Sequence, residues 1–428
     1  MIVGIPFEWR LAGLFVIGAT LASVLNLAVY RLAWDKRLIS PWSPPPEGAG
    51  ARIWFDRVPI FGWLSLRRET PVLGRGFWIR PMLVELAAGL GLATLYWWDV
   101  DQQAILPAVE RIPLEKMSLA APLTDGLLHA IFLSHALLFS LMLVASLIDF
   151  DEKTIPDTIT VPGMLLGLVL AAILPWSLLP ASVTHEAGVA TPLIDFLHVA
   201  SPNLWPASLL GNETVTSLLI GGGCYALWCF WLLPRTWHGR YGARRALRYL
   251  VARIAREPWS VIVFAMWIAG TIVIATLWKS NPTHWAALVT SLVGMAVGGG
   301  TIWLVRLIGY AVLRREAMGF GDVTLMAMIG AFVGWQTAIL VFFLAPAVGL
   351  VFGTVNWLLK SENEIPYGPF LCVATLAIVI RWADVWLAVR PHFSLGIWIP
   401  VLLGGCLVLM VVLLFLLQVV KAVLSPRD

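Results

Sequence analysis

Charged residues are scarce in this chain of 428 residues. Asp, Glu, Lys and Arg make up 13% of it, and hydrophobic residues make up 59%, whereas a soluble domain carries about 25% charged residues. The apolar residues gather in runs of roughly 20, which is the length that crosses a bilayer as a helix. They do not form the short alternating segments of a membrane β-barrel. The composition therefore excludes a soluble enzyme and predicts an all-α polytopic membrane protein.

Motifs that would indicate a metal centre or a nucleotide site are also missing. The four cysteines are Cys224, Cys229, Cys372 and Cys406; all lie in apolar runs and none forms a CxxC pair. We therefore predict buried free thiols. No glycine fingerprint of the Rossmann type is present. The histidines lack the spacing of metal ligands, so we expect neither a metal site nor a nucleic-acid partner.

The apolar runs predict about eleven membrane-spanning helices. They lie near residues 11–32, 81–98, 127–149, 158–180, 214–234, 259–279, 284–312, 323–337, 339–359, 368–388 and 395–420. Lys and Arg orient such helices, because they gather in cytoplasmic loops. Residues 31–80 and 235–258 are rich in them, whereas 181–213 has none. The first two segments are therefore expected in the cytoplasm and the third outside.

Two cytoplasmic segments differ in what they predict. Residues 34–80 are rich in Pro, Gly and Trp and too short to bury much of a core, so we expect a small irregular extension. The Arg-rich segment 235–258 leaves two interpretations open. It is either a plain topology signal, which is the simpler interpretation, or an amphipathic helix that lies on anionic headgroups.

Acidic residues gather at two points of the cytoplasmic membrane edge. The stretch SLIDFDEKTIPD holds Asp149, Asp151, Glu152 and Asp157, and AMGFGD ends in Asp322. Ionisable groups at the edge of the hydrocarbon are costly and usually functional, although acidic residues at a helix end are also common solvated caps. Two carboxylates held close together cannot easily both ionise, so such a pair can supply one general base and one general acid. This is the chemistry of an aspartic protease.

Glycine and proline residues flank the two acidic sites. Gly319 and Gly321 would let the backbone turn sharply beside Asp322 and let a peptide approach. Pro156 ends the helix that carries Asp149 and starts a new one. Each pattern is weak alone, and it is the matched side and depth of the two sites that favours a joint function.

Together these residues resemble the type IV prepilin peptidases, the GxGD-type aspartic proteases of bacterial inner membranes. That family pairs an Asp six residues before Ile/Leu-Pro-Asp with a second Asp in Gly-x-Gly-Asp. Asp149 and Asp322 match these positions, and the resemblance implies that they are catalytic. The matching motif residues are Gly319, Gly321, Pro156 and Asp157. Similar stretches, among them RPMLVEL and EIPYGPFL, extend over roughly 10–98, 130–180 and 285–385.

The chain also departs from the family pattern. Typical bacterial members carry two zinc-binding CxxC pairs in the first cytoplasmic loop, where this chain has ISPWSPPPEG and RRETPVLGRG, so no zinc is expected. Thr324 replaces the usual Lys two residues after the second Asp. Members have about eight spans, and we attribute the surplus to an inserted helix pair near 214–279 and a last span near 395–420.

The resemblance divides the chain into three expected parts. Residues 1–98 form a methyltransferase-like region, 99–388 the membrane peptidase core with its insertion, and 389–428 an additional span and tail. The implied activity is removal of the leader from type IV prepilins and pseudopilins at the cytoplasmic face of the bacterial inner membrane, in contact with membrane lipids.

Several alternatives stay open. One of them is methylation of the new N-terminus with S-adenosylmethionine. In the resembled family this activity is attributed to the N-terminal cytoplasmic region, and in this chain that region lacks the family's cysteines. Glu85 would contact the amine or the cofactor's sulfonium, or else pair with Arg80 or Arg31. A peptidase without methyltransferase activity and another GxGD intramembrane protease are the remaining enzymatic alternatives. A transporter and an inactive scaffold are disfavoured, since no paired repeat is visible and both aspartates are present.

Overall fold

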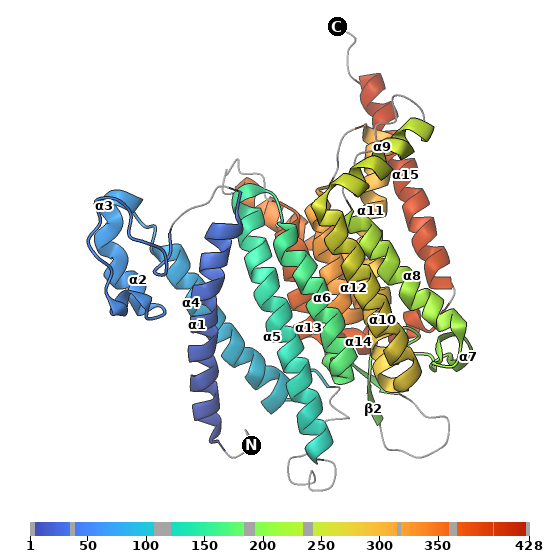
Figure 1. The fold of residues 1–428 in the computed structure, drawn as a ribbon, viewed down its shortest axis with the longest axis horizontal. Helices are drawn as coiled ribbons and strands as arrows, with labels where there is room; N and C mark the ends of the chain where they lie inside the picture. Colours follow the sequence, from blue (N-terminus) through green and yellow to red (C-terminus); the bar gives the residue numbers. More distant parts are fainter. Residues whose placement is uncertain are drawn as a thin grey trace.

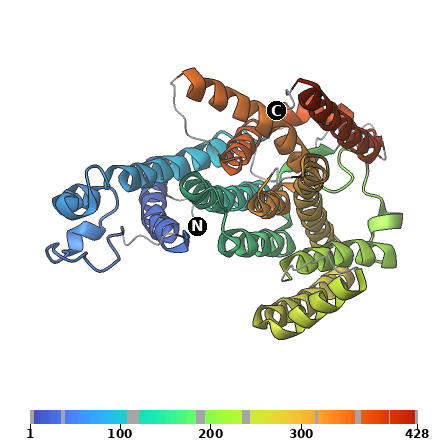
Figure 2. The ribbon, with the colours of Figure 1, turned by 90° about the horizontal axis from the view of Figure 1, so that it is seen from above.

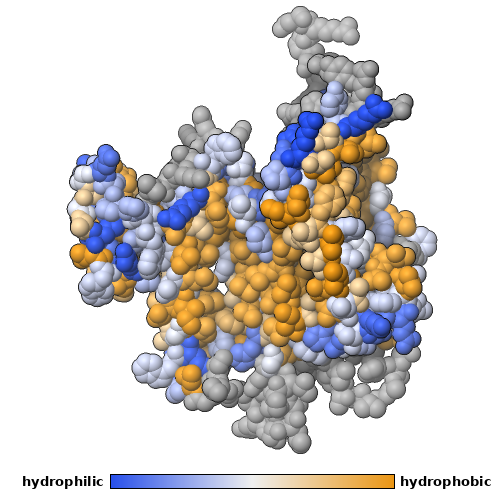
Figure 3. Space-filling view, viewed as in Figure 1, coloured by the Kyte–Doolittle hydropathy of each residue, from blue (hydrophilic) through white to orange (hydrophobic). Residues whose placement is uncertain are grey.

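The computed structural model describes residues 5–34, 39–106, 121–183, 193–233, 243–314, 318–358, 366–396 and 398–424. Within this part of the chain, long helices stand side by side in a bundle (Figure 1). On the face shown in Figure 3, a broad apolar band lies between two more polar ends. Eight of the described helices are long and apolar enough to cross a membrane, or nine if one bent pair counts as a span. The prediction of a helical polytopic membrane protein is confirmed at this level.

The first half of the chain combines long helices with short connecting elements. The long helices are α1 (Phe7–Leu32), α4 (Ile79–Tyr96), α5 (Ala121–Glu152), α6 (Asp157–Ile173) and α8 (Val215–Leu232). The short ones are α2 (Phe61–Leu66), α3 (Thr70–Leu73), α7 (Ala207–Leu210) and the turns η2 (Trp54–Arg57), η3 (Arg67–Glu69), η4 (Trp97–Asp101) and η7 (Pro175–Ser177). The strands β1 (Pro180–Val183) and β2 (Leu193–Phe196) pair antiparallel.

Helices make up most of the described residues in the second half of the chain. Its helices are α9 (Ala243–Arg256), α10 (Pro258–Ser280), α11 (Pro282–Leu313), α12 (Phe320–Leu358), α13 (Gly368–Ile380), α14 (Trp382–Phe393) and α15 (Trp398–Leu424). Viewed from above, the extension formed by α2 and α3 stands to one side of the bundle (Figure 2).

The predicted number of about eleven spans is not confirmed, for three reasons. Helix α6 has 17 residues, which is about 25 Å of helix and short of a bilayer core of about 30 Å. The runs 323–337 and 339–359 both lie in α12, where Gly334 alone departs from helical geometry with φ 78° and ψ 169°. The run 368–388 is divided into α13 and α14, which meet at 94°.

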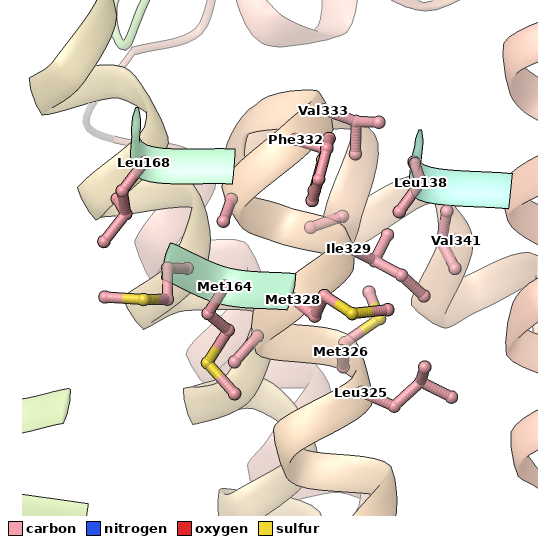
Figure 4. Packing of buried hydrophobic residues seen from close by; sticks show 14 of the residues in the cluster. Leu138, Met164, Leu168, Leu325, Met326, Met328, Ile329, Phe332, Val333 and Val341 are labelled. Carbon is pink, nitrogen blue, oxygen red and sulfur yellow. The ribbon is translucent and has the colours of Figure 1, made fainter. Parts of the chain in front are cut away.

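The apolar core lies where α5 and α6 meet α12 (Figure 4). Its side chains include Leu138, Met164, Leu168, Met328, Ile329, Phe332 and Val341. Helices α11 and α12 approach so closely that a Cβ on Gly294 would overlap the carbonyl oxygen of Gly330. Such contacts between small residues let membrane helices gain packing energy that the hydrophobic effect cannot supply within lipid.

The prediction of buried thiols is only partly confirmed. Cys229 and Cys372 are buried and Cys224 is partly buried, but Cys406 is exposed on α15. The prediction fails there because α15 is an apolar helix whose described side chains are mostly exposed, as expected for a lipid-facing span.

The outward loop predicted at 181–213 contains β2 and α7 and is tied to α12. Trp335 donates its indole N–H to the carbonyl oxygen of Val199 at 2.8 Å, and the side-chain amide of Gln336 donates to that of His198 at 2.8 Å. Burial lowers the pKa of His198 to about 4, so its ring is neutral at neutral pH. The loop therefore fixes the break in α12 through backbone acceptors.

Ion pairs stabilise the small N-terminal extension. Arg52 binds Glu69 at 3.0 Å, and their side chains are only 5% and 1% exposed. The same guanidinium donates to the carbonyl oxygens of Ser40 and Ser43. Arg52 therefore links the two stretches, ISPWSPPPEG and RRETPVLGRG, that stand where the resembled family carries cysteine pairs.

A second ion pair in the extension joins Arg68 to Asp56 at 2.5 Å. Burial would raise the pKa of Asp56, but hydrogen bonds from Arg68, Ser65 and the backbone of Ile53 outweigh it and hold the pKa below its ordinary value. This pair therefore stabilises the extension at neutral pH, and its contribution is lost as Asp56 is protonated in acid.

We expect Arg52→Met and Glu69→Gln each to destabilise the extension, because removing one partner leaves a buried charge unpaired, at a cost of roughly 3–5 kcal/mol. Limited proteolysis of the detergent-solubilised protein should show faster cleavage within residues 39–78. Arg75→Gln, an exposed arginine of the same segment, is the matched control. Cleavage of Arg52→Met at the wild-type rate would show that the pair does not hold the extension together.

Candidate active site

Asp149 lies in the last turn of α5 and is 3% exposed. The helix ends just beyond it, where Lys153 adopts the left-handed conformation with φ 56° and its N–H donates to the carbonyl oxygen of Asp149 at 2.8 Å. Pro156 then precedes the first residue of α6. These local stop and start signals place the carboxylate at the end of the helix, at the edge of the apolar band.

The carboxylate of Asp149 meets the beginning of α13. The backbone N–H of Gly368 donates to Oδ2 of Asp149 at 3.1 Å. Gly368 is the first residue of α13, so this N–H has no acceptor within its own helix, and the helix N-terminus favours a negative charge. A Cβ on Gly368 would overlap the carboxylate. The contact therefore requires glycine at this position.

Asp322 lies in the first turn of α12 and is 8% exposed. A Cβ on Gly319 would lie 3.5 Å from Oδ2 of Asp322, so the backbone of Gly319 borders this carboxylate. A Cβ on Gly321 would lie 2.8 Å from the Cβ of Ile155 and 3.1 Å from its backbone nitrogen. Gly321 therefore lets the start of α12 pack against the α5–α6 connection. Sequence analysis expected a sharp turn here, but neither Gly319 nor Gly321 has a positive φ.

Asp149 and Asp322 are therefore brought to one end of the bundle by contacts with the same connecting segment. Their charges interact, and both side chains are nearly buried. Ile155 lies against both Gly321 and Gly368, so it joins the three helices that build the pair. Two carboxylates held close together in such surroundings are the arrangement that coupled general acid and base chemistry requires.

The other three acidic residues of SLIDFDEKTIPD have different partners. Asp151 forms an ion pair with Arg80 at 2.7 Å. Glu152 accepts a hydrogen bond from the backbone N–H of Trp34 at 2.6 Å. Asp157 lies 3.5 Å from the hydroxyl of Thr324, so the residue in place of the family's lysine contacts the motif but brings no charge. Among the described residues, no group of three His, Cys, Asp or Glu side chains could hold a metal ion.

Glu85 lies outside this pair and is fully buried in α4. Its Oε2 accepts a hydrogen bond from the N–H of Ile60 at 2.6 Å. Ile60 has φ 66° and ψ −59°, a strained conformation for a β-branched residue, and the N–H of Phe61 donates to Pro59 across it at 2.7 Å. Glu85 therefore anchors a strained turn of the extension. Neither of the pairings left open by the sequence, with Arg80 or with Arg31, is formed: Oε1 of Glu85 has no hydrogen-bond partner among the described residues, and Arg80 pairs with Asp151.

An apolar cavity of about 480 Å³ lies between α1, α4, α5 and α13. Gly18, Ala88, Gly91 and Ser140 are among its lining residues. Ser140 precedes Asp149 by two and a half helical turns, so the two side chains point to opposite sides of α5. The cavity therefore does not belong to the candidate active site.

Sequence analysis missed Gly368 and Ile155 as parts of the site. Gly368 lies in the EIPYGPFL stretch that carried the resemblance, and a glycine before a proline at a helix start was the available signal. Nothing in the local sequence marks Ile155, because its role depends on glycines of two distant helices.

The fold and the carboxylate pair define a multi-pass membrane protein with an acidic site at one membrane edge. A family model described as the type IV leader peptidase family matches residues 136–233 and 259–354. A second model, the bacterial Peptidase A24 N-terminal domain, matches residues 16–99. The two models cover more than half of the chain, which belongs to the type IV leader peptidase family, a bacterial family.

Several relatives share parts of this sequence. A prepilin leader peptidase/N-methyltransferase of Stutzerimonas stutzeri is 38% identical over 102 residues, which are 23% of this chain and 35% of the relative. The Myxococcus xanthus protein of the same name is 28% identical over 161 residues, covering 37% and 39%. The type 4 prepilin-like proteins leader peptide-processing enzyme of Escherichia coli is 29% identical over 118 residues, covering 26% and 43%.

The chain thus spans less than half the length of each of these relatives. No match was found among the solved structures.

Proposed function

We propose that this protein is an aspartic endopeptidase that removes the leader from type IV prepilins and pseudopilins. Asp149 and Asp322 are its catalytic pair, and Gly319, Gly321, Pro156 and Asp157 position them. The observation that carries the proposal is the approach of two nearly buried carboxylates, from distant parts of the sequence, at one membrane edge in a member of the leader peptidase family.

The pair would act on a water molecule and a peptide bond. An ionised carboxylate takes a proton from the water as it attacks the scissile carbonyl, and the protonated partner donates to the carbonyl oxygen or the leaving amine. Asp149 accepts a backbone hydrogen bond from Gly368, and the backbone of Gly319 borders the carboxylate of Asp322. These contacts do not distinguish base from acid.

The proposal places the pair at the cytoplasmic face of the bacterial inner membrane. The Arg-rich α9 and the N-terminal extension lie at the same end of the bundle as the end of α5 (Figure 1). Since Lys and Arg mark cytoplasmic loops, this common end supports a cytoplasmic site in contact with prepilin substrates.

The proposal also treats α12 as two crossings joined at Gly334. A Cβ on Gly298 would lie 2.6 Å from the carbonyl oxygen of Met326 and 3.6 Å from the Cβ of Ala338. A straight helix would separate those two residues by about 18 Å, so the chain must fold back between them. With α6 counted as a short crossing and α13–α14 as one broken span, the total is about eleven.

Asp149→Asn and Asp322→Asn should each abolish leader removal. In either variant the one remaining carboxyl group cannot supply both the general base and the general acid. Co-expression with a candidate prepilin, followed by intact mass measurement, would detect the loss. Asp151→Asn is the matched control, since Asp151 pairs with Arg80 instead, and it should keep activity. Full processing by either dyad variant would refute the assignment.

Gly368→Ala should lower the cleavage rate by roughly a hundredfold, because its methyl group displaces the Asp149 carboxylate and small misplacements are that costly. Gly353→Ala is the control, since a Cβ there meets no neighbouring atom. Initial rates in detergent, normalised to protein that elutes as a single folded species, would compare the two. Equal rates would mean that the Gly368 contact does not position Asp149.

Methylation of the new N-terminus is a second candidate function. Its support is the match of the N-terminal domain model and the names of the relatives. S-adenosylmethionine would be the methyl donor, and the structure shows Glu85 bonded to Ile60 through Oε2, with Oε1 buried and without a hydrogen-bond partner among the described residues. We assign Glu85 to positioning the extension and derive no methyl-transfer step.

The intact mass of the processed pilin decides this second function. A methylating enzyme would yield a product heavier than the leaderless chain by the mass that one methylation adds. A product with the mass of the unmodified leaderless chain would exclude methylation and would still support the peptidase proposal. Glu85→Gln, which keeps the size of the side chain, should leave cleavage intact.

A further inference from the structure

Helix α9 lies in a segment that the family model skips, residues 234–258. Its sequence, ARRALRYLVARIAR, contains five arginines and no acidic residue. Leu247, Val251 and Ile254 recur at helical spacing and therefore share one face. Arg256 lies on the opposite face. The helix is amphipathic, with its charge all of one sign.

The position of α9 is restricted by the span that follows it. Helix α8 ends at Leu232 and α10 begins at Pro258, directly after α9 ends at Arg256. In Figure 1 the helix lies obliquely across the end of the bundle. Two residues of extended chain reach about 7 Å at most, so the C-terminal end of α9 cannot leave the membrane surface.

Two described residues of the apolar face of α9 are exposed, and Ile254 on the same face is partly exposed. Leu247 is 55% exposed and Val251 58% exposed. A soluble surface rarely leaves such a helix face open to water, and a helix tethered at the membrane edge has the lipid boundary within reach. Apolar faces of interfacial helices enter this boundary by about 5–10 Å.

We propose that α9 lies in the cytoplasmic headgroup layer and binds anionic phospholipids. Its apolar face, with Leu247 and Val251, enters the acyl boundary, and its arginines bind lipid phosphates. The one-signed charge of the helix matches a negative surface, which attracts basic residues close to the membrane. The short tether to α10 favours lipid over a protein partner, because it holds the helix against the bilayer. This inference is independent of the proposed catalytic function.

The test compares two neighbouring positions of the full-length protein in nanodiscs. A variant with its four cysteines replaced by alanine receives Val251→Cys on the apolar face or Ala252→Cys, which points away from it, and each carries a fluorescent label. With phosphatidylglycerol present, a lipid-borne nitroxide should quench the label at 251 more strongly than the label at 252. Aqueous iodide should quench the label at 251 severalfold less than the label at 252. Equal quenching at both positions would overturn the proposal.

A second measurement keeps the native cysteines. Hydrogen exchange of the α9 backbone amides should be slower in nanodiscs that contain phosphatidylglycerol than in phosphatidylcholine alone. The combined substitution Arg248→Gln, Arg253→Gln and Arg256→Gln should abolish the difference. Lys279→Gln, at the other end of α10, should not. Exchange that does not depend on lipid charge, or protection that requires an added protein, would contradict lipid binding.

Discussion

The hydrogen bond between the N–H of Gly368 and Asp149 is the contact on which the candidate site depends. A carboxylate at the edge of the hydrocarbon is tolerated only if it has partners, and here a helix N-terminus supplies one. The bond fixes the start of α13 against the end of α5. Ile155 fills the space between this contact and Gly321 of α12. Weakening the contact would therefore loosen three helices together, not one side chain.

Close packing at glycine is the means by which the bundle builds a polar site inside an apolar frame. Membrane helices gain little from burying apolar surface against each other, so van der Waals contact and hydrogen bonds must hold them. Gly294 and Gly330 bring α11 against α12, and Gly321 and Gly368 bring the site together. Gly321, beside Asp322, thus matters because the missing side chain lets Ile155 approach the start of α12. The φ angles of both glycines beside Asp322 are ordinary for any residue.

The sequence predicted the parts of the structure that depend on local composition. Apolar runs placed most of the long helices, and acidic residues at their ends indicated Asp149 and Asp322. The number of spans stays a prediction, because eight or nine helices meet the length and composition of a span. The runs 323–337 and 339–359 placed the break in α12 within a few residues of Gly334, but no local pattern showed that α6 is short. The role of Gly368 and the Arg52–Glu69 pair depend on contacts between distant segments, which no local pattern encodes.

Three features of different origin share one end of the molecule. The extension is held by the Arg52–Glu69 and Arg68–Asp56 pairs, the carboxylate pair by glycine contacts, and α9 by its short connection to α10. The extension and the site touch through Arg80 and Asp151 and through Trp34 and Glu152. Asp151 and Glu152 thus connect the extension to the helix that carries Asp149, whereas Asp157 lies near Thr324 of α12.

The closeness of Asp149 and Asp322 is the central claim, and thiol cross-linking tests it without a substrate. Asp149→Cys and Asp322→Cys would be combined in a protein whose native cysteines are alanine. A short bifunctional thiol reagent would then be added, followed by a protease that cuts at a site engineered between residues 234 and 242. The account predicts that the two fragments stay joined for this pair and separate for Asp151→Cys with Asp322→Cys. The account would be contradicted if the fragments separated in the Asp149→Cys/Asp322→Cys variant and stayed joined in the Asp151→Cys/Asp322→Cys variant.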